Sequence, residues 1–323
     1  MAERSQVWFQ RMAIITTIAV YILIIVGGSV RASGAGMGCP DWPKCFGQWI
    51  PPTDVSQLPA DYQTIYKDRG YANVIFNPVK TWTEYFNRLT GATIGILVFI
   101  TLILAWVRRR SDAAAFKASL AAFLLVGFNG WLGSVVVSSN LHPAMITTHM
   151  FAALLTVAVL IYATTRSWSR WHRPDSIPTR GLSFALAIAL VLSLAQIAMG
   201  TQVREAVDVL ALNPQFADRA TWFAALGQTV MTHVIFAGLV VVWNAGVIVL
   251  LWRWASQQKV LRRLIIALAG VILAQVAMGV SFALAGFPAL LQPLHLLGAG
   301  LIFGLQIALL LALQDARRAP VML

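Results

Sequence analysis

Residues 86–107 read FNRLTGATIGILVFITLILAWV, and the three arginines 108–110 follow them directly. The run is apolar, does not alternate with polar residues, and is long enough for a helix to cross about 30 Å of hydrocarbon. Seven similar runs lie at roughly 12–30, 117–138, 144–165, 181–203, 225–252, 263–285 and 291–313. A backbone in lipid must satisfy its own hydrogen bonds, and these runs lack the alternation of a barrel strand. The sequence therefore predicts an all-α integral membrane protein with eight transmembrane helices.

The composition agrees with this fold class. Hydrophobic residues make up 59% of the 323 residues, charged residues make up 11%, and the mean hydropathy is +0.73. A soluble domain carries about 25% charged residues, so the chain lacks the polar surface that water requires. The first apolar run follows a basic N-terminus, but it is longer than the roughly 7–15 residues of a signal-peptide core. We therefore expect it to be the first transmembrane helix.

The net charge of +12 is distributed unevenly along the chain. If the N-terminus is cytoplasmic, sixteen of the 24 basic residues lie on the cytoplasmic side and eight on the other side. The sixteen are Arg4, Arg11, Arg108, Arg109, Arg110, Lys117, Arg166, Arg170, Arg173, Arg180, Arg253, Lys259, Arg262, Arg263, Arg317 and Arg318. The eight are Arg31, Lys44, Lys67, Arg69, Lys80, Arg88, Arg204 and Arg219. This bias predicts cytoplasmic N- and C-termini in a cell (inner) membrane, and it gives no reason to expect nucleic-acid binding.

Faint internal similarity divides the chain into two halves of four helices, residues 1–170 and 171–323. The sequence GGSVR at 27–31 resembles GTQVR at 200–204, and His149 and His295 each precede small residues by one helical turn. Matching positions at matched depths predict two pseudo-symmetric four-helix bundles, related by an axis along the membrane normal. The first half also carries a long extracytoplasmic loop over residues 31–83.

Three of the five histidines, His149, His233 and His295, lie within the expected spans. Ionisable residues in lipid are costly and mark functional sites, although a lone histidine also serves as an interhelical hydrogen-bond partner. His233 and His295 lie at similar depth in one half, each with small residues one turn later. Two neutral imidazoles with room for a flat ring between them suit bis-histidine haem ligation. Zinc or copper would require further nitrogen, sulfur or carboxylate ligands at that depth.

The first half offers one good axial ligand for haem iron. His149 stands at one corresponding position, whereas Asn87 stands at the other, and an amide is a poor iron ligand. Such a site either leaves one face of the iron open for chemistry or has decayed. Glu84 lies one turn before Asn87 on the same helical face. It is either a catalytic carboxylate or an ordinary carboxylate near a helix N-terminus.

Other charged and sulfur-containing residues lie near the outer ends of the spans. Arg31, Arg88 and Arg204 either bind haem propionates through paired hydrogen bonds or anchor helix ends. Cys39 and Cys45 lie in the outer loop, on the side of the membrane where disulfides persist. Their short spacing lets the loop close, so the pair is either a structural clip or a redox-active bridge. Two thiols without a nearby histidine do not make a zinc site.

Three segments together resemble the haem A synthase family, in its bacterial form with an outer-loop cysteine pair. They are GCPDWPKC at 38–45, GGSVR at 27–31 and EYFNRL at 84–89. The resemblance covers essentially the whole chain and extends to the pairs Asn129/Gly133 and Gln275/Gly279. It implies a pseudo-symmetric eight-helix fold that oxidises the C8 methyl of haem O to a formyl group. Two hydroxylations and loss of water would give haem A, which serves terminal oxidases.

The resemblance also implies roles for individual residues. His233 and His295 would hold a resident haem b, and His149 would bind the substrate haem. Glu84 would take part in catalysis, and Cys39 and Cys45 would form a redox-active disulfide. Implied partners are the haem O synthase (protohaem farnesyltransferase), a terminal oxidase or its assembly factors, and an electron donor such as a quinol, a ferredoxin or a thioredoxin-like protein. A homo-oligomer is left open.

The chain departs from the family at two positions. Asn87 stands where the family has a histidine, which removes a ligand from the expected substrate site. Val234 stands where the family has an arginine after the helix-six histidine, which removes a propionate partner. Two alternatives therefore stand beside the haem-modifying oxidoreductase. One is a non-catalytic b-type cytochrome that transfers electrons, and the other is a haem carrier or assembly protein for a terminal oxidase.

Overall fold

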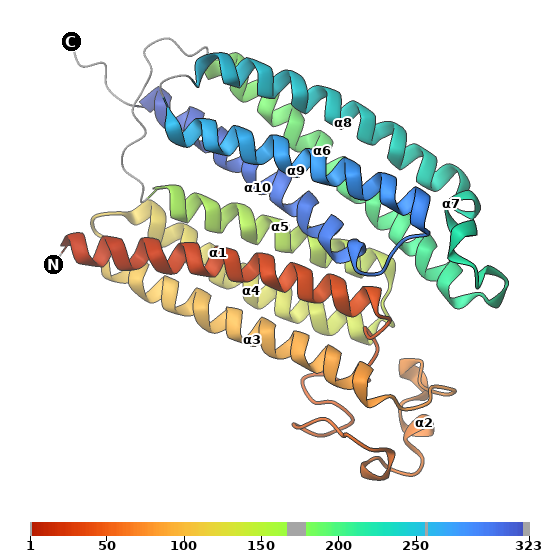
Figure 1. Cartoon of the computed structure of the whole chain (residues 1–323). Helices are drawn as coiled ribbons and strands as arrows, with labels where there is room; N and C mark the ends of the chain where they lie inside the picture. The colour runs from red at the N-terminus through yellow and green to blue at the C-terminus, as the bar shows by residue number, and fades with distance from the viewer. Residues whose placement is uncertain (1, 167–178, 256–257, 319–323) are drawn as a thin grey trace, which may run out of the picture. The chain divides into compact units, whose positions relative to one another are not determined.

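The computed structural model describes residues 2–166, 179–255 and 258–318 (Figure 1). Eight helices are long and apolar enough to cross a membrane, which confirms the predicted all-α membrane fold. These helices are α1 (Ala2–Ala32), α3 (Pro78–Val107), α4 (Ala113–Ser138), α5 (Pro143–Arg166), α6 (Thr179–Leu212), α8 (Gly227–Trp254), α9 (Lys259–Ala285) and α10 (Leu291–Arg318). The short helices are η1 (Val55–Gln57), α2 (Tyr62–Ile65), η2 (Lys67–Arg69), η3 (Pro214–Phe216), η4 (Arg219–Thr221) and α7 (Trp222–Ala225).

The chain forms two compact units, residues 1–160 and 161–323, which we call the first and second units. The predicted boundary at 170/171 lies outside the described residues, as do Arg170, His172 and Arg173. The symmetry between the halves and the cytoplasmic location of the termini stay predictions. Below, "outer" denotes the helix ends that the charge distribution predicts to be extracytoplasmic.

Several helices extend beyond their predicted limits, and two of these extensions affect the outer loops. α3 begins at Pro78, because Asn77 caps it by accepting a hydrogen bond from the Lys80 N–H at 3.1 Å. The outer loop is therefore shorter than the predicted 31–83, and Glu84 lies inside the helix. α6 continues to Leu212, so the prediction that a loop starts at residue 204 is wrong. An ion pair between Arg204 and Asp208, 2.7 Å apart and one turn apart on the helix, supports the added turns.

In the first unit, α1 packs against α3, and α3 packs against α4. Small and hydroxyl residues allow the close approach of α1 and α3. The hydroxyls of Thr16 and Thr101 lie 2.9 Å apart, and both side chains are buried. Hydrogen bonds of this kind join helices in lipid, where no water competes for the hydroxyl groups.

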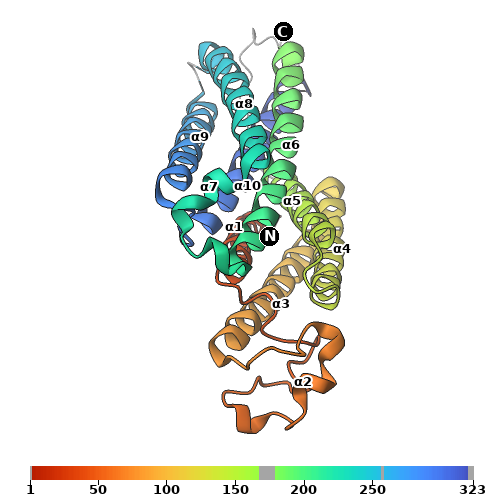
Figure 2. The same cartoon turned by 90° about the vertical axis from the view of Figure 1, so that its right-hand side faces the viewer.

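Residues 33–77 form a small folded segment at the outer ends of α1 and α3, which we call the outer cap (Figure 2). Its centre is Phe46, whose ring lies edge-on to four aromatic rings at centroid distances of 5.6–6.2 Å. The four belong to Tyr62, Tyr66, Tyr71 and Phe76. Both cysteines belong to the same cluster and are fully buried. The aromatic cluster gives the outer cap a hydrophobic core of its own.

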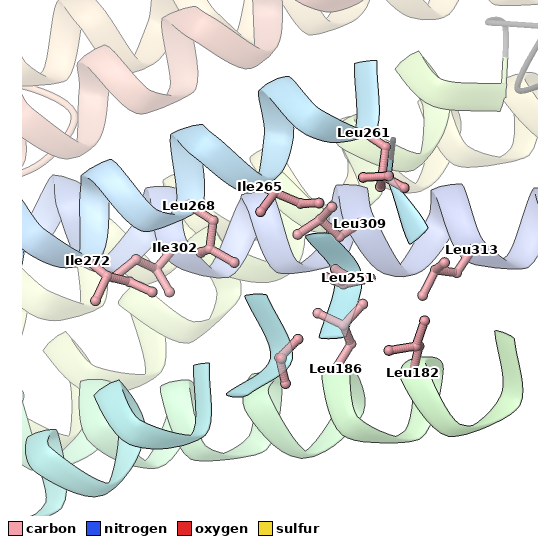
Figure 3. Packing of buried hydrophobic residues seen from close by; sticks show 12 residues of the cluster. Leu182, Leu186, Leu251, Leu261, Ile265, Leu268, Ile272, Ile302, Leu309 and Leu313 are labelled. Atoms are coloured by element: carbon pink, nitrogen blue, oxygen red, sulfur yellow. The ribbon is translucent and has the colours of Figure 1, made fainter. Parts of the chain in front are cut away.

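In the second unit, α6 packs against α8 and α10, and α9 packs against α10. A large apolar cluster fills the inner part of this bundle (Figure 3) and includes Leu186, Leu251 and Leu309. A smaller cluster around Trp222 and Phe282 fills the outer part. Each of the four helices carries a polar side chain between these two clusters: Gln196 on α6, His233 on α8, Gln275 on α9 and His295 on α10. The two clusters thus enclose a polar layer, which contains both candidate haem ligands.

Candidate functional site

His233 of α8 faces α6 within the polar layer of the second unit. The amide nitrogen Nε2 of Gln196 lies 3.1 Å from Nδ1 and 3.2 Å from Nε2 of His233, and it donates to the His233 carbonyl oxygen at 3.1 Å. Gly200, one turn further along α6, lets the ring approach, since a Cβ there would lie 3.3 Å from Cε1 of His233. Gln196 and Gly200 therefore fix the position of the imidazole.

His295 of α10 has a similar neighbourhood, supplied by α9. Gln275 packs so closely against Gly298 that a Cβ at that glycine would lie 2.6 Å from the amide oxygen Oε1. The ring of Phe282 meets the His295 imidazole edge-on at a centroid distance of 5.2 Å. His295 lies in the first turns of α10, and His233 lies in the first turns of α8. The structure therefore brings the two predicted ligands into one layer of one unit.

The first unit holds a related pair of helices, α4 and α5. A Cβ at Gly133 of α4 would lie 3.7 Å from Cε1 of His149 on α5. Asn129, one turn earlier on α4, donates from Nδ2 to the hydroxyl of Thr156 on α5 at 3.2 Å. As at His233, a glycine and an amide on one helix face a histidine on the next. His142, at the start of α5, is exposed to solvent.

Asn87 lies opposite a glycine of α1. A Cβ at Gly27 would lie 3.8 Å from the Asn87 amide oxygen Oδ1. This oxygen is buried and has no hydrogen-bond partner among the described residues. A buried acceptor without a partner lowers the free energy of unfolding by about 1–3 kcal/mol. Asn87 carries this cost at the position where the family resemblance leads us to expect a histidine.

Two of the three span histidines, His149 and His295, have an unsatisfied ring nitrogen that could bind haem iron, whereas the ring nitrogens of His233 contact Gln196. Nδ1 of His149 and Nδ1 of His295 are buried, and within the described part of the chain neither has a hydrogen-bond partner. A neutral imidazole buried in this way can offer a lone pair to a metal. The glycines beside His149 and His233 leave the rings without a bulky neighbour on that side. These observations support a haem site, and the ligand assignment stays a prediction.

Glu84 lies beneath the outer cap and is 3% exposed. Its oxygen Oε2 accepts a hydrogen bond from the backbone N–H of Cys39 at 2.9 Å. Its oxygen Oε1 accepts from Arg88, one turn later on α3, at 3.1 Å from Nε and by a second bond from Nη2. The carboxylate therefore touches the cysteine loop directly, which the sequence did not predict.

Cys39 and Cys45 form a disulfide, as the sequence resemblance implied. Asp41 shapes the loop between them by accepting from the backbone N–H of Phe46 at 2.6 Å and of Gly47 at 2.8 Å. The loop is pressed onto α3, because a Cβ at Gly38 would lie 2.3 Å from the Lys80 carbonyl oxygen. Only glycine allows this approach.

Tyr71 also ties the outer cap together. Its hydroxyl donates to the Met37 carbonyl oxygen. Burial raises the pKa of the Tyr71 phenol well above its usual range, and the nearby charge of Glu84 raises it further. The hydroxyl is therefore protonated at any physiological pH and remains a donor.

The three arginines proposed for propionate binding differ in their surroundings. Arg88 is directed into the cysteine loop, where it binds carbonyl oxygens of Asp41 and Lys44 at 2.7 and 2.9 Å. Arg204 pairs with Asp208 along α6. Arg31 lies in the last turn of α1. The propionate role remains untested for Arg31 and Arg204, whereas the contacts of Arg88 suggest a different role.

A sequence model of the COX15-CtaA family, described as cytochrome oxidase assembly protein, matches residues 10–307. The chain belongs to this family. The match covers most of the chain and confirms the resemblance predicted from its motifs. Together with the eight apolar helices, membership identifies a multi-pass protein of the cell membrane.

Relatives of this COX15-CtaA member include proteins named haem A synthase. The one from Rhizorhabdus wittichii is 26% identical over 298 residues, which cover 84% of each chain. The one from Shewanella oneidensis is 27% identical over 193 residues, 60% of this chain and 55% of the relative. The one from Agrobacterium fabrum is 30% identical over 195 residues, 57% of this chain and 53% of the relative. The matches to the last two span about half of each relative's length.

The sequence did not predict the roles of two site residues, Gln196 and Asp41. Gln196 had no predicted role, yet its amide nitrogen contacts the His233 ring. Asp41 was noted only as part of a motif, yet it organises the disulfide loop. The signal for Asp41 was present, because an aspartate a few residues before a glycine often caps a tight loop.

Proposed function

We propose that this protein is a haem A synthase-like oxidoreductase that converts haem O to haem A in the membrane. Two hydroxylations, each a two-electron oxidation by an oxidant such as dioxygen supplied from outside the chain, would convert the C8 methyl of haem O to a geminal diol, which loses water to leave the formyl group. The observation that carries this proposal is the buried Glu84 carboxylate, held against a disulfide at the outer end of the unit that contains His149. The names of the relatives support haem A as the product.

The protein residues divide the work between the two units. In the first unit His149 binds the substrate haem iron, and Glu84 orients or accepts a proton near the reacting methyl group. In the second unit His233 and His295 hold a resident haem b, which when bound supplies one-electron transfer. Gln196 keeps His233 in position, because its amide nitrogen donates to the His233 carbonyl oxygen and contacts the imidazole ring.

The experiment is expression in a host that lacks haem A and is supplied with a haem O synthase, followed by chromatography of extracted haems. We expect haem A or its hydroxylated intermediate with the wild-type chain. Glu84→Gln should lower conversion about 100-fold or more, the usual contribution of a proton-transfer group. The matched control is Glu205→Gln, because Glu205 is an exposed carboxylate near the outer end of α6. Unmodified haem O in a folded wild-type preparation would refute the proposal.

The second candidate function is a b-type cytochrome that transfers electrons without modifying haem. Asn87 favours it, since it removes an axial ligand from the first unit while His233 and His295 remain. The same chromatography separates the candidates: a cytochrome would bind haem B, give a reversible reduced-minus-oxidised spectrum, and leave haem O unchanged.

A further inference from the structure

Arg88 lies at the meeting point of α3, the disulfide loop and Glu84. Its side chain is 12% exposed, and that of Glu84 is 4% exposed. The guanidinium donates to Glu84 on its own helix and to carbonyl oxygens of loop residues 39, 41 and 44. These residues lie more than forty positions earlier in the chain. One side chain therefore joins two distant segments.

All five N–H groups of this guanidinium have acceptors. Nε and one Nη2 hydrogen bind Oε1 of Glu84, and the other Nη2 hydrogen faces the Cys39 carbonyl oxygen at 3.4 Å. The two Nη1 hydrogens bind the Asp41 and Lys44 carbonyl oxygens. A guanidinium carries five donors in a fixed plane, so this arrangement leaves none for a haem propionate.

The loop depends on this arginine because it has few backbone hydrogen bonds of its own. Within residues 39–48 of the described chain, backbone-to-backbone hydrogen bonds join only Cys45 and Gln48. Three of its carbonyl oxygens turn toward Arg88 instead. A lysine has three donors on one point charge and cannot reach this spread of acceptors.

We propose that Arg88 is a positioning residue that holds the disulfide loop and Glu84 as one assembly. With the loop in place, the Cys39 N–H and the guanidinium together fix both carboxylate oxygens. Opening of the loop removes the Cys39 N–H from Glu84 and the loop carbonyl oxygens from Arg88 at the same time. The catalytic consequence rests on the proposed function of Glu84, whereas the mechanical link does not.

The state of the disulfide offers a direct measure of this link. Cys39 and Cys45 are fully buried, so a thiol reductant reaches sulfur only when the loop opens. In reduction by dithiothreitol, two reductant thiols give up two electrons and two protons, which convert the bridge to two cysteine thiols and leave a cyclic disulfide. Alkylation of the new thiols with a maleimide mass tag counts opened molecules with time.

We expect Arg88→Lys to speed disulfide reduction about tenfold or more in the purified full-length protein, because at least two charge-assisted hydrogen bonds are lost. Glu84→Gln should speed it less, since an amide oxygen still accepts the Cys39 N–H. The matched control is Arg69→Lys in the same outer cap, where Arg69 donates to a single carbonyl oxygen, that of Ser138. This control should reduce at the wild-type rate.

The double variant separates positioning from general damage. If Arg88 acts through Glu84, adding Arg88→Lys to Glu84→Gln should not lower haem conversion further. Haem content and the haem spectrum should match the wild type in Arg88→Lys. A wild-type rate of disulfide reduction in Arg88→Lys would overturn the proposal. A loss of haem from Arg88→Lys with an unchanged rate of disulfide reduction would also overturn it. If no variant or wild type converts haem O, the reduction rates still decide the mechanical link, while the proposed function fails separately.

Discussion

Replacing Gly38 by alanine tests how tightly the outer cap is held on α3. The added Cβ would lie 2.3 Å from the Lys80 carbonyl oxygen, 2.6 Å from the carbonyl carbon and 2.9 Å from Cα of Thr81. All three are backbone atoms of a helix and cannot turn aside. Normal contact requires more than 3 Å, so the loop must retreat by roughly 1 Å.

That retreat breaks two hydrogen bonds of known length. The Cys39 N–H to Glu84 and the Thr81 hydroxyl to the Gly38 carbonyl are both 2.9 Å long, and both would exceed hydrogen-bonding distance. The bond to a charged group contributes about 1.5–3 kcal/mol and the neutral one about 1 kcal/mol. A loss of about 3 kcal/mol raises the open fraction of the loop about 100-fold, at 1.4 kcal/mol per factor of ten.

Hydrogen–deuterium exchange with mass spectrometry measures this opening. The amide of Cys39, which Glu84 protects, should exchange about 100-fold faster in Gly38→Ala. The control is Gly36→Ala, because a Cβ there meets only the tip of the Leu141 side chain at 3.3 Å. Exchange in Gly38→Ala at the wild-type rate would show that the cap is not pressed on α3 and would refute the reasoning.

Three further predictions concern the helices. His233→Ala or His295→Ala should abolish a low-spin b-type spectrum in haem-loaded protein, and unchanged spectra in both would refute the ligand assignment. Asn87→His should supply a second imidazole ligand to a haem bound by His149. A new low-spin haem signal should then appear in electron paramagnetic resonance. Absence of this signal would place residue 87 away from the iron. The buried amide of Gln306 joins α6 and α8, so Gln306→Leu should destabilise the second unit by about 1–3 kcal/mol. The expected result is a lower melting temperature in detergent, and an unchanged melting temperature would contradict it.

The last of these predictions rests on a polar contact deep within the apolar bundle. Nε2 of Gln306 donates to Ser193 at 3.0 Å and to Asn244 at 2.9 Å, and all three side chains are buried. A leucine would leave the Ser193 and Asn244 acceptors without their donor. Hydrogen bonds between helices contribute modestly in lipid, and the cost comes mainly from the unpaired groups.

The membrane fold could be predicted from the sequence because its cause is local. Length and hydropathy of each run are properties of neighbouring residues, and lipid forces such runs into helices. All eight predicted spans are helices in the structure. The helix limits were less certain, since the start of α3 depends on one cap by Asn77.

Of the candidate site, the sequence by itself determined the chemical types. It predicted imidazoles within spans and a cysteine pair and a carboxylate toward the outer helix ends, while the family resemblance marked Asn87 as a departure. Only the tertiary structure decided the partners: Gln196 on the His233 ring, and the Cys39 N–H and Arg88 on Glu84. The physical reason is that a residue type fixes how many hydrogen bonds a group can make. Which acceptor a donor meets across forty residues depends on the path of the folded chain.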